Sequence, residues 1–222
     1  MCQLTPSRLK SLLVASHLGP TVLVVTITLC IALSQFSFLE TFRISLAIFA
    51  GQLVVGWSNE VIDYPLDLAA HRMKKPLVSG SLQVSMLKKL IPLALIAAIL
   101  LSFFTPFGLI GTLIHLLGIL SATLYNLKLK STVLSPIPYL VSFSALPWAI
   151  FLSAGERPPI WLYCSLALFT TTFHFLNVLK DLEIDINQGV LGLPQRLGKK
   201  RSIIVAAVLA TLGVLVICIR FL

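Results

Sequence analysis

The sequence is short of charge, and of acidic charge above all. Only 11% of its 222 residues are charged, where a soluble domain of this size would carry about a quarter. Eight residues are acidic, and four of these are aspartates. This composition excludes an ordinary soluble globular protein. The 57% of hydrophobic residues and the mean hydropathy of +0.97 indicate an integral membrane protein instead.

Cysteine is scarce too, and it forms no metal-binding pattern. The four cysteines are Cys2, Cys30, Cys164 and Cys218. They make neither a CxxC pair nor a cysteine–histidine spacing, so neither a zinc site nor a disulfide framework is indicated, and we expect packing roles. No small-residue cleavage site follows the first apolar run, so this run is interpreted as a membrane helix rather than a signal peptide.

Apolar runs near membrane-spanning length recur about seven times along the chain. They cover roughly residues 18–38, 42–62, 86–104, 107–124, 133–154, 159–180 and 202–221. Only helices satisfy their own backbone polar groups within a single membrane-spanning segment of this length. The predicted fold class is therefore all-α, a multi-pass transmembrane helical bundle of about seven spans.

The net charge of +9 lies in the loops between these runs rather than on a basic face, so no nucleic-acid partner is expected. With the N-terminus on the cytoplasmic side, fourteen Lys and Arg residues fall inside. The three outside are Arg43, Arg157 and Arg220. The positive-inside rule thus predicts a cytoplasmic N-terminus. We expect the chain to lie among the lipids of a bacterial plasma membrane.

Every aspartate belongs to one repeated pattern. Residues 59–80 read NEVIDYPLDLAAHRMKKPLVSG, and residues 177–198 read NVLKDLEIDINQGVLGLPQRLG. Both segments begin with Asn and then place Asp at the fifth and ninth positions, Pro at the eighteenth and Gly at the twenty-second. A four-residue spacing predicts that each Asn-Asp-Asp set lies along one stripe of a helix, where like charges repel unless a cation lies between them.

The two stripes offer only oxygen ligands, which favour a hard ion such as Mg²⁺. Basic residues follow them along the chain: Arg72, Lys74, Lys75, Lys128, Lys130 and Arg196. Carboxylates that hold a metal, surrounded by Lys and Arg, suit a diphosphate at a membrane face. The 118-residue offset between the stripes predicts one domain of two similar half-units around a shared central cavity.

Together these motifs resemble the UbiA superfamily of intramembrane prenyltransferases. The resemblance rests on the N-x-x-x-D-x-x-x-D motif at Asn59, a Tyr followed by Lys after the fourth run at Tyr125, and the D-x-x-x-D motif at Asp181. It implies a helical bundle around a lipid-accessible cavity, in which both Asp-rich motifs bind a prenyl diphosphate through Mg²⁺. The prenyl group would pass to a membrane-accessible acceptor, in this family usually an aromatic ring.

The resemblance also assigns roles to residues. It gives the catalytic and metal-binding roles to Asp63, Asp67, Asp181 and Asp185, with Glu60 as a further metal ligand where the family usually has Asp. It gives diphosphate binding to Asn59, Arg72, Lys75, Tyr125, Lys128, Lys130, Asn177 and Arg196. Which of the two lysines after Tyr125 acts is open. Because typical members have nine spans, a chain of seven would either lack part of the cavity wall or take it from another subunit of an oligomer.

Two other functions compete with this interpretation. Transfer from a CDP-alcohol also uses acidic clusters at a membrane edge, but the D-G-x-x-A-R opening of that class is missing here. A non-catalytic isoprenoid- or lipid-binding protein, a degenerate member of the family, is the main alternative. Metal-dependent product formation would separate an enzyme from such a protein. For single residues there are plainer roles as well, such as an interfacial position for Tyr125 and topology signals for the basic residues.

Overall fold

The computed structural model describes residues 6–220, and all regular secondary structure in this range is helical. Cys2 lies outside the described residues. The chain folds as two compact units, Met1–Thr112 and Leu113–Leu222, and α5 (Gly108–Leu127) runs from the first into the second. The boundary falls between the two Asp-containing segments, so each unit contains one of them.

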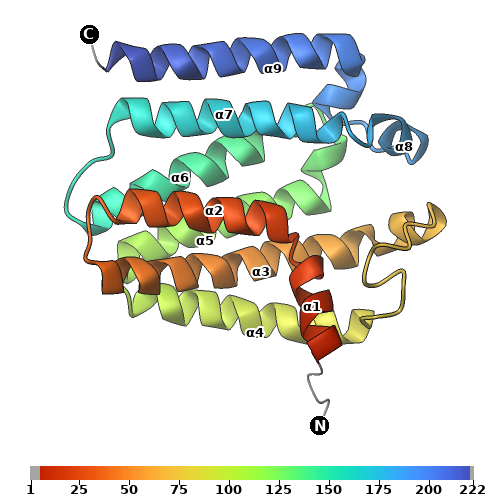
Figure 1. The fold of residues 1–222 in the computed structure, drawn as a ribbon, viewed down its shortest axis with the longest axis horizontal. Coiled ribbons are helices and arrows are strands. Elements are labelled where there is room, and N and C mark those ends of the chain that lie inside the picture. The colour runs from red at the N-terminus through yellow and green to blue at the C-terminus, as the bar shows by residue number, and fades with distance from the viewer. Residues whose placement is uncertain (1–5, 221–222) are drawn as a thin grey trace. The chain divides into compact units, whose positions relative to one another are not determined.

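The first unit is organised around one long helix, α3 (Phe38–Ala69). Helices α2 (Leu18–Ala32) and α4 (Val84–Phe103) both pack along it, as Figure 1 shows. The short α1 (Pro6–Ala15) meets α2 at an elbow of 72°. The elbow is fixed to α3 by the indole of Trp57, whose Nε1–H donates a hydrogen bond to the carbonyl of Leu12 at 3.0 Å.

Helix α3 begins at a capping box and extends beyond the apolar run that predicted it. The Ser37 hydroxyl accepts from the Glu40 N–H, and the Glu40 carboxylate accepts from the Ser37 N–H. The sequence placed the end of this span near residue 62, but the helix continues through Pro65 to Ala69. Its 32 residues make it about 48 Å long, against about 30 Å for a hydrocarbon core. The acidic last turns therefore have length to project past the membrane core.

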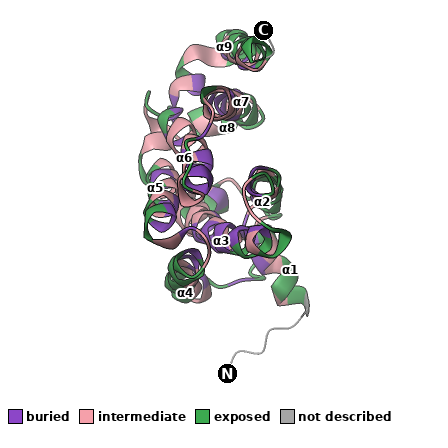
Figure 2. Cartoon of the chain, turned by 90° about the vertical axis from the view of Figure 1, so that its left-hand side faces the viewer, coloured by how far each residue is buried: buried purple, intermediate pink, exposed green. Residues whose placement is uncertain are grey.

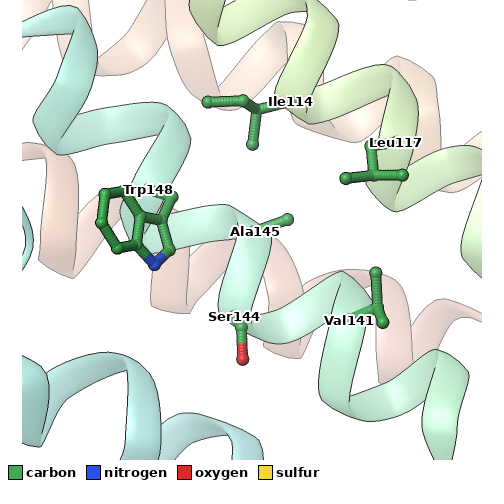
Figure 3. Close-up of a pocket in the computed structure, with 6 residues that line it drawn as sticks. All are labelled: Ile114, Leu117, Val141, Ser144, Ala145 and Trp148. Carbon is green, nitrogen blue, oxygen red and sulfur yellow. The ribbon is translucent and has the colours of Figure 1, made fainter.

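The second unit is organised around α7 (Ile160–Val178), which packs between α6 (Ile137–Ser153) and α9 (Leu193–Ile219) (Figure 1). A 3₁₀ turn, Leu129–Ser131, follows α5, and the six-residue α8 (Leu182–Asn187) lies between α7 and α9. A cavity of about 300 Å³ in this unit, shown in Figure 3, has an apolar lining. Its wall is formed by Ile114, Leu117, Val141, Ser144, Ala145 and Trp148.

Exposed residues, green in Figure 2, lie along several of the helices, and many of them are large and apolar. On α4, for example, Leu93 and Leu100 are exposed, and on α9 Ile204 and Val208 are exposed. Helices α3, α4, α5 and α9 are long and apolar enough to cross a membrane, and the bent α1–α2 pair would be a fifth span. The all-helical, multi-pass fold agrees with the sequence, whereas the number of seven spans stays a prediction.

Candidate functional site

The first acidic segment occupies the last turns of α3, as the spacing predicted. Asn59, Asp63 and Asp67 lie on one continuous helix. Asp67 is only 4% exposed and Glu60 only 2%, while Asn59 and Asp63 are half-buried. Buried carboxylates require charge partners or hydrogen bonds, since an uncompensated buried charge is strongly destabilising.

Those partners come from the loop that follows α3. The ammonium of Lys75 lies 3.1 Å from Glu60 Oε2 and 3.6 Å from Asp67 Oδ2. Arg72 Nη1 lies 3.3 Å from Asp67 Oδ1, while Lys74 is exposed. The loop therefore folds back on the helix, and its own cations offset the repulsion between the acids of the stripe.

The elbow between α1 and α2 adds a residue that the sequence did not single out for this site. His17 Nε2 lies 3.1 Å from Asn59 Nδ2 and 4.0 Å from Glu60 Oε2. His17 is more than forty positions before the motif, so no local spacing could have revealed the contact. The contact orients the side chain of Asn59.

The second acidic segment does not form the single helical stripe that the sequence predicted. Helix α7 ends at Val178, and α8 begins only at Leu182. Between them the N–H groups of Lys180 and Asp181 donate to carbonyls three residues back, and Asp181 has non-helical dihedral angles of −117° and 13°. Asp disfavours helix interiors because its side chain offers the backbone alternative hydrogen bonds, which accords with a break at this point.

The three predicted residues of this segment thus belong to different elements. Asn177 is exposed in the last turn of α7, and its Oδ1 lies 3.4 Å from Lys180 Nζ. Asp181 is exposed just before α8, whereas Asp185 lies within it and is half-buried. The Asp185 carboxylate accepts a hydrogen bond of 2.9 Å from Nε2 of Gln195.

Gln195 is a second contact residue that the sequence did not predict. It is 7% exposed and lies in the first turn of α9. The next residue, Arg196, is exposed, and its Nε–H donates to the Leu191 carbonyl at 2.8 Å. An amide on a basic segment gives no signal in a single sequence, because Gln is an ordinary surface residue.

Within the second unit, the chain at the start of α9 packs closely against the loop that follows α5. A Cβ atom on Gly192 would lie 2.5 Å from the carbonyl oxygen of Lys130, so only glycine fits this close approach. The Leu193 N–H donates to the Ser135 hydroxyl at 3.1 Å. That hydroxyl also lies 3.2 Å from Nε2 of His174, which is 1% exposed. The Tyr–Lys loop and the end of the second acidic segment are thereby held together.

The predicted diphosphate-binding residues at the end of α5 and in the loop after it differ in their surroundings. The Tyr125 ring meets those of Tyr139 and His174 edge-on, at centroid distances of 5.3 and 5.6 Å. Lys128 is exposed and Lys130 is half-buried. The structure therefore places both lysines near the turn that follows Tyr125 but does not select between them.

The carboxylates fit a metal that a ligand helps to hold, rather than one caged by protein alone. Within residues 6–220, no three His, Cys, Asp or Glu side chains gather closely enough to form a metal site by themselves. Mg²⁺ is commonly held by one or two carboxylates, with water and substrate phosphates completing its shell. The oxygen-only donors of each segment match that requirement.

Comparison with known proteins identifies the family. The profile of the UbiA prenyltransferase family matches residues 19–222. This chain belongs to the UbiA prenyltransferase family. The resemblance found in its motifs is thus confirmed, and its long apolar helices, together with the family, make it an integral membrane protein. Among proteins with curated descriptions, none matches the sequence.

Solved structures show the same fold for this UbiA family member. A digeranylgeranylglyceryl phosphate synthase superposes with a TM-score of 0.69 at 22% identity, over 94% of this chain and 76% of that one. A UbiA homologue from Archaeoglobus fulgidus bound to GPP and Mg²⁺ gives 0.73 at 17% identity, over 93% and 76%. The same homologue bound to DMAPP and Mg²⁺ gives 0.73 at 17%, over 93% and 76%. At such identities the likeness establishes the fold.

Proposed function

We propose that this protein transfers a prenyl group from a prenyl diphosphate to a lipophilic, aromatic acceptor, and that the transfer depends on Mg²⁺. The observation that carries the proposal is the folded first segment, where a half-buried Asp63 lies on the same helix as two buried acids already held by Lys75 and Arg72. Such a surface combines oxygen ligands for a metal with fixed cations for a phosphate.

Each group has a distinct task in this proposal. Asp63 and Asp67 in the first segment, and Asp181 and Asp185 in the second, supply carboxylate oxygens toward Mg²⁺. When bound, the metal supplies Lewis-acid stabilisation of the charge that develops on the leaving diphosphate. Further positive charge and hydrogen bonds on the phosphate oxygens come from Asn59, Arg72, Lys75, Tyr125, Lys128, Lys130, Asn177 and Arg196. Breaking the carbon–oxygen bond then releases diphosphate and leaves an allylic cation. The electron-rich ring of the acceptor attacks this cation and loses a proton, which restores its aromaticity.

Membrane burial suits this chemistry because water would otherwise capture the cation. An apolar site excludes water and strengthens electrostatic interactions within it. The proposal therefore places the acceptor in the lipid phase and the phosphate groups at the cytoplasmic face of a bacterial plasma membrane, on the side of the N-terminus. It also assigns both acidic segments to one prenyl diphosphate, in a single domain of two half-units or in an oligomer of it.

The relatives of known structure support the donor class. The Archaeoglobus fulgidus homologue is bound to prenyl diphosphates, GPP or DMAPP, with Mg²⁺. We expect the same class of donor here, because the family and the fold are shared and the carboxylates fit the metal.

The direct test uses the purified protein in lipid nanodiscs with Mg²⁺, prenyl diphosphates of several lengths and a panel of phenolic and quinol acceptors. We expect release of diphosphate and a prenylated acceptor, both lost when EDTA is added. Donor binding without product, across the whole panel, would instead indicate the non-catalytic alternative. Folded protein that neither binds nor turns over any donor would refute the proposal.

A further inference from the structure

Glu60 was expected to be a metal ligand, but in the structure both of its carboxylate oxygens already have partners within the first unit. It is 2% exposed in α3. Oε2 lies 3.1 Å from the Lys75 ammonium, and Oε1 accepts from the Leu77 N–H at 3.5 Å. Both oxygens therefore face the loop that follows α3.

Lys75 joins Glu60 to the acidic stripe. Its ammonium lies 3.6 Å from Asp67 Oδ2, so one cation bridges two carboxylates that are seven residues apart on α3. Seven residues correspond to about two helical turns, which puts both acids on the same face. The Lys75 side chain is 23% exposed, so it is largely shielded from solvent while part of it remains accessible.

A metal on Glu60 would have to displace this ammonium. Mg²⁺ demands oxygen ligands at about 2.0–2.1 Å. An ion that close to Oε2 would be repelled by the ammonium that lies 3.1 Å from the same oxygen. Removal of Lys75 from Glu60 would also break a buried ion pair, which is strongly destabilising. Asp63, one turn from Glu60 and half-buried, has the more accessible carboxylate.

We propose that Glu60 is a positioning residue rather than a metal ligand: it holds the Lys75 ammonium beside Asp67, where the ammonium meets the diphosphate of the donor. This inference rests on the proposed function. It leaves Asp63 as the accessible carboxylate of the first segment for the metal. It also makes the Glu60–Lys75 pair one unit, so the two residues affect donor binding through the same interaction.

The test compares Glu60→Gln, Lys75→Met and the double variant with the wild-type protein in nanodiscs. Mn²⁺ binding is measured by electron paramagnetic resonance without donor, and donor binding is measured with a radiolabelled prenyl diphosphate and saturating Mg²⁺. Glu156→Gln, an exposed acid in the loop between α6 and α7, is the control for loss of one negative charge.

We expect each single variant to weaken donor binding about tenfold, because either change frees or removes the fixed cation. Mn²⁺ binding should stay within about twofold of the wild type in Glu60→Gln. The double variant should bind donor no more weakly than the weaker single variant, since coupled residues are not additive. It should also melt higher than Glu60→Gln, which leaves Lys75 without that partner.

Three results would overturn the inference, and the first two are a tenfold loss of Mn²⁺ binding in Glu60→Gln and donor affinities that fall multiplicatively in the double variant. Unchanged donor binding by folded Glu60→Gln would overturn it as well. Failure of the wild-type protein to bind any prenyl diphosphate would instead refute the proposed function, so the two failures are distinguishable.

Discussion

Segments 59–80 and 177–198 carry the same five-point pattern, yet their acidic parts fold differently. In the first, Asn59, Asp63 and Asp67 share the long helix α3. In the second, Asn177 lies in the last turn of α7, and Asp185 lies on the separate α8. Identical spacing of Asn and Asp is therefore compatible with a continuous helix and with a broken one.

The ends of the two acidic helices are nevertheless alike. The N–H of Arg72 donates to the Asp67 carbonyl at 3.0 Å, and the N–H of Val190 donates to the Asp185 carbonyl at 2.8 Å. In each case the last Asp of the pattern is two residues before the helix end, and the hydrogen bond is the one that closes a Schellman motif. The repeated pattern therefore predicts how each acidic helix ends better than it predicts one continuous helix.

Left-handed backbone positions recur at the same register. His71 and Gly189, which are 118 residues apart, have φ values of 51° and 76°. Gly80 and Gly198, separated by the same interval, have φ values of 74° and 73°. Each half thus leaves its acidic helix through one left-handed residue. A second left-handed residue lies before α4 in the first half, at Gly80, and at a kink inside α9 in the second, at Gly198. The shared Gly is explained by backbone geometry, whereas the shared Asp residues require a reason in side-chain chemistry.

The largest expected effect tests whether both halves contribute to the chemistry. Asp63→Asn and Asp181→Asn should each lower kcat/KM by about 100- to 1,000-fold, because each removes a charged oxygen ligand while keeping the shape. Steady-state release of diphosphate measures this. Glu183→Gln, an exposed acid outside the register, is the control and should stay near wild type. Near-normal activity of either Asp variant would show that its half is dispensable.

The next effect concerns how tightly the loop after each acidic helix packs against its neighbours. Gly192→Ala should destabilise the protein by about 1–3 kcal/mol, because its Cβ would meet the Lys130 carbonyl at 2.5 Å. The residue at the same register in the first half is the exposed Lys74, and Lys74→Ala should stay within about 0.5 kcal/mol. Denaturation in mild detergent compares the two. Equal stability of both variants would contradict the close packing of the second loop against the Lys130 carbonyl.

A smaller effect should follow loss of the Gln195 contact. Gln195→Leu keeps the bulk but removes the donor to Asp185 Oδ2, and we expect kcat/KM to fall about tenfold. Because Asp185 is then less fixed, the Mg²⁺ concentration for half-maximal activity should rise too. Asn187→Leu, an exposed change on α8, controls for added apolar surface. A loss of stability with normal kinetics would make Gln195 purely structural.

The smallest effects compare the left-handed positions. Gly189→Ala should cost about 1 kcal/mol, since nothing lies within 4 Å of its added Cβ and only the positive φ opposes it. His71→Gly should relieve strain and change stability by a few tenths of a kcal/mol at most. Thermal melts of both variants are the measurement. A stabilised Gly189→Ala would show that this residue does not need a left-handed conformation.

The sequence by itself determined the class of protein and the residues at issue. The low share of charged residues and the long apolar runs predict membrane-spanning helices, because backbone polar groups in a hydrocarbon core must be hydrogen-bonded within the protein. The five-point repeat marked both acidic segments and led to the correct family. Because these features depend on composition and on spacing along the chain, they can be recognised in a single sequence.

Only the tertiary structure decided how those residues are held. It extended α3 to Ala69, broke the helix before Asp181, and brought Lys75 to Glu60, Gln195 to Asp185 and His17 to Asn59. None of these contacts has a helical spacing. They depend on where a loop or a distant helix comes to rest, which is set by packing across the unit rather than by the local pattern.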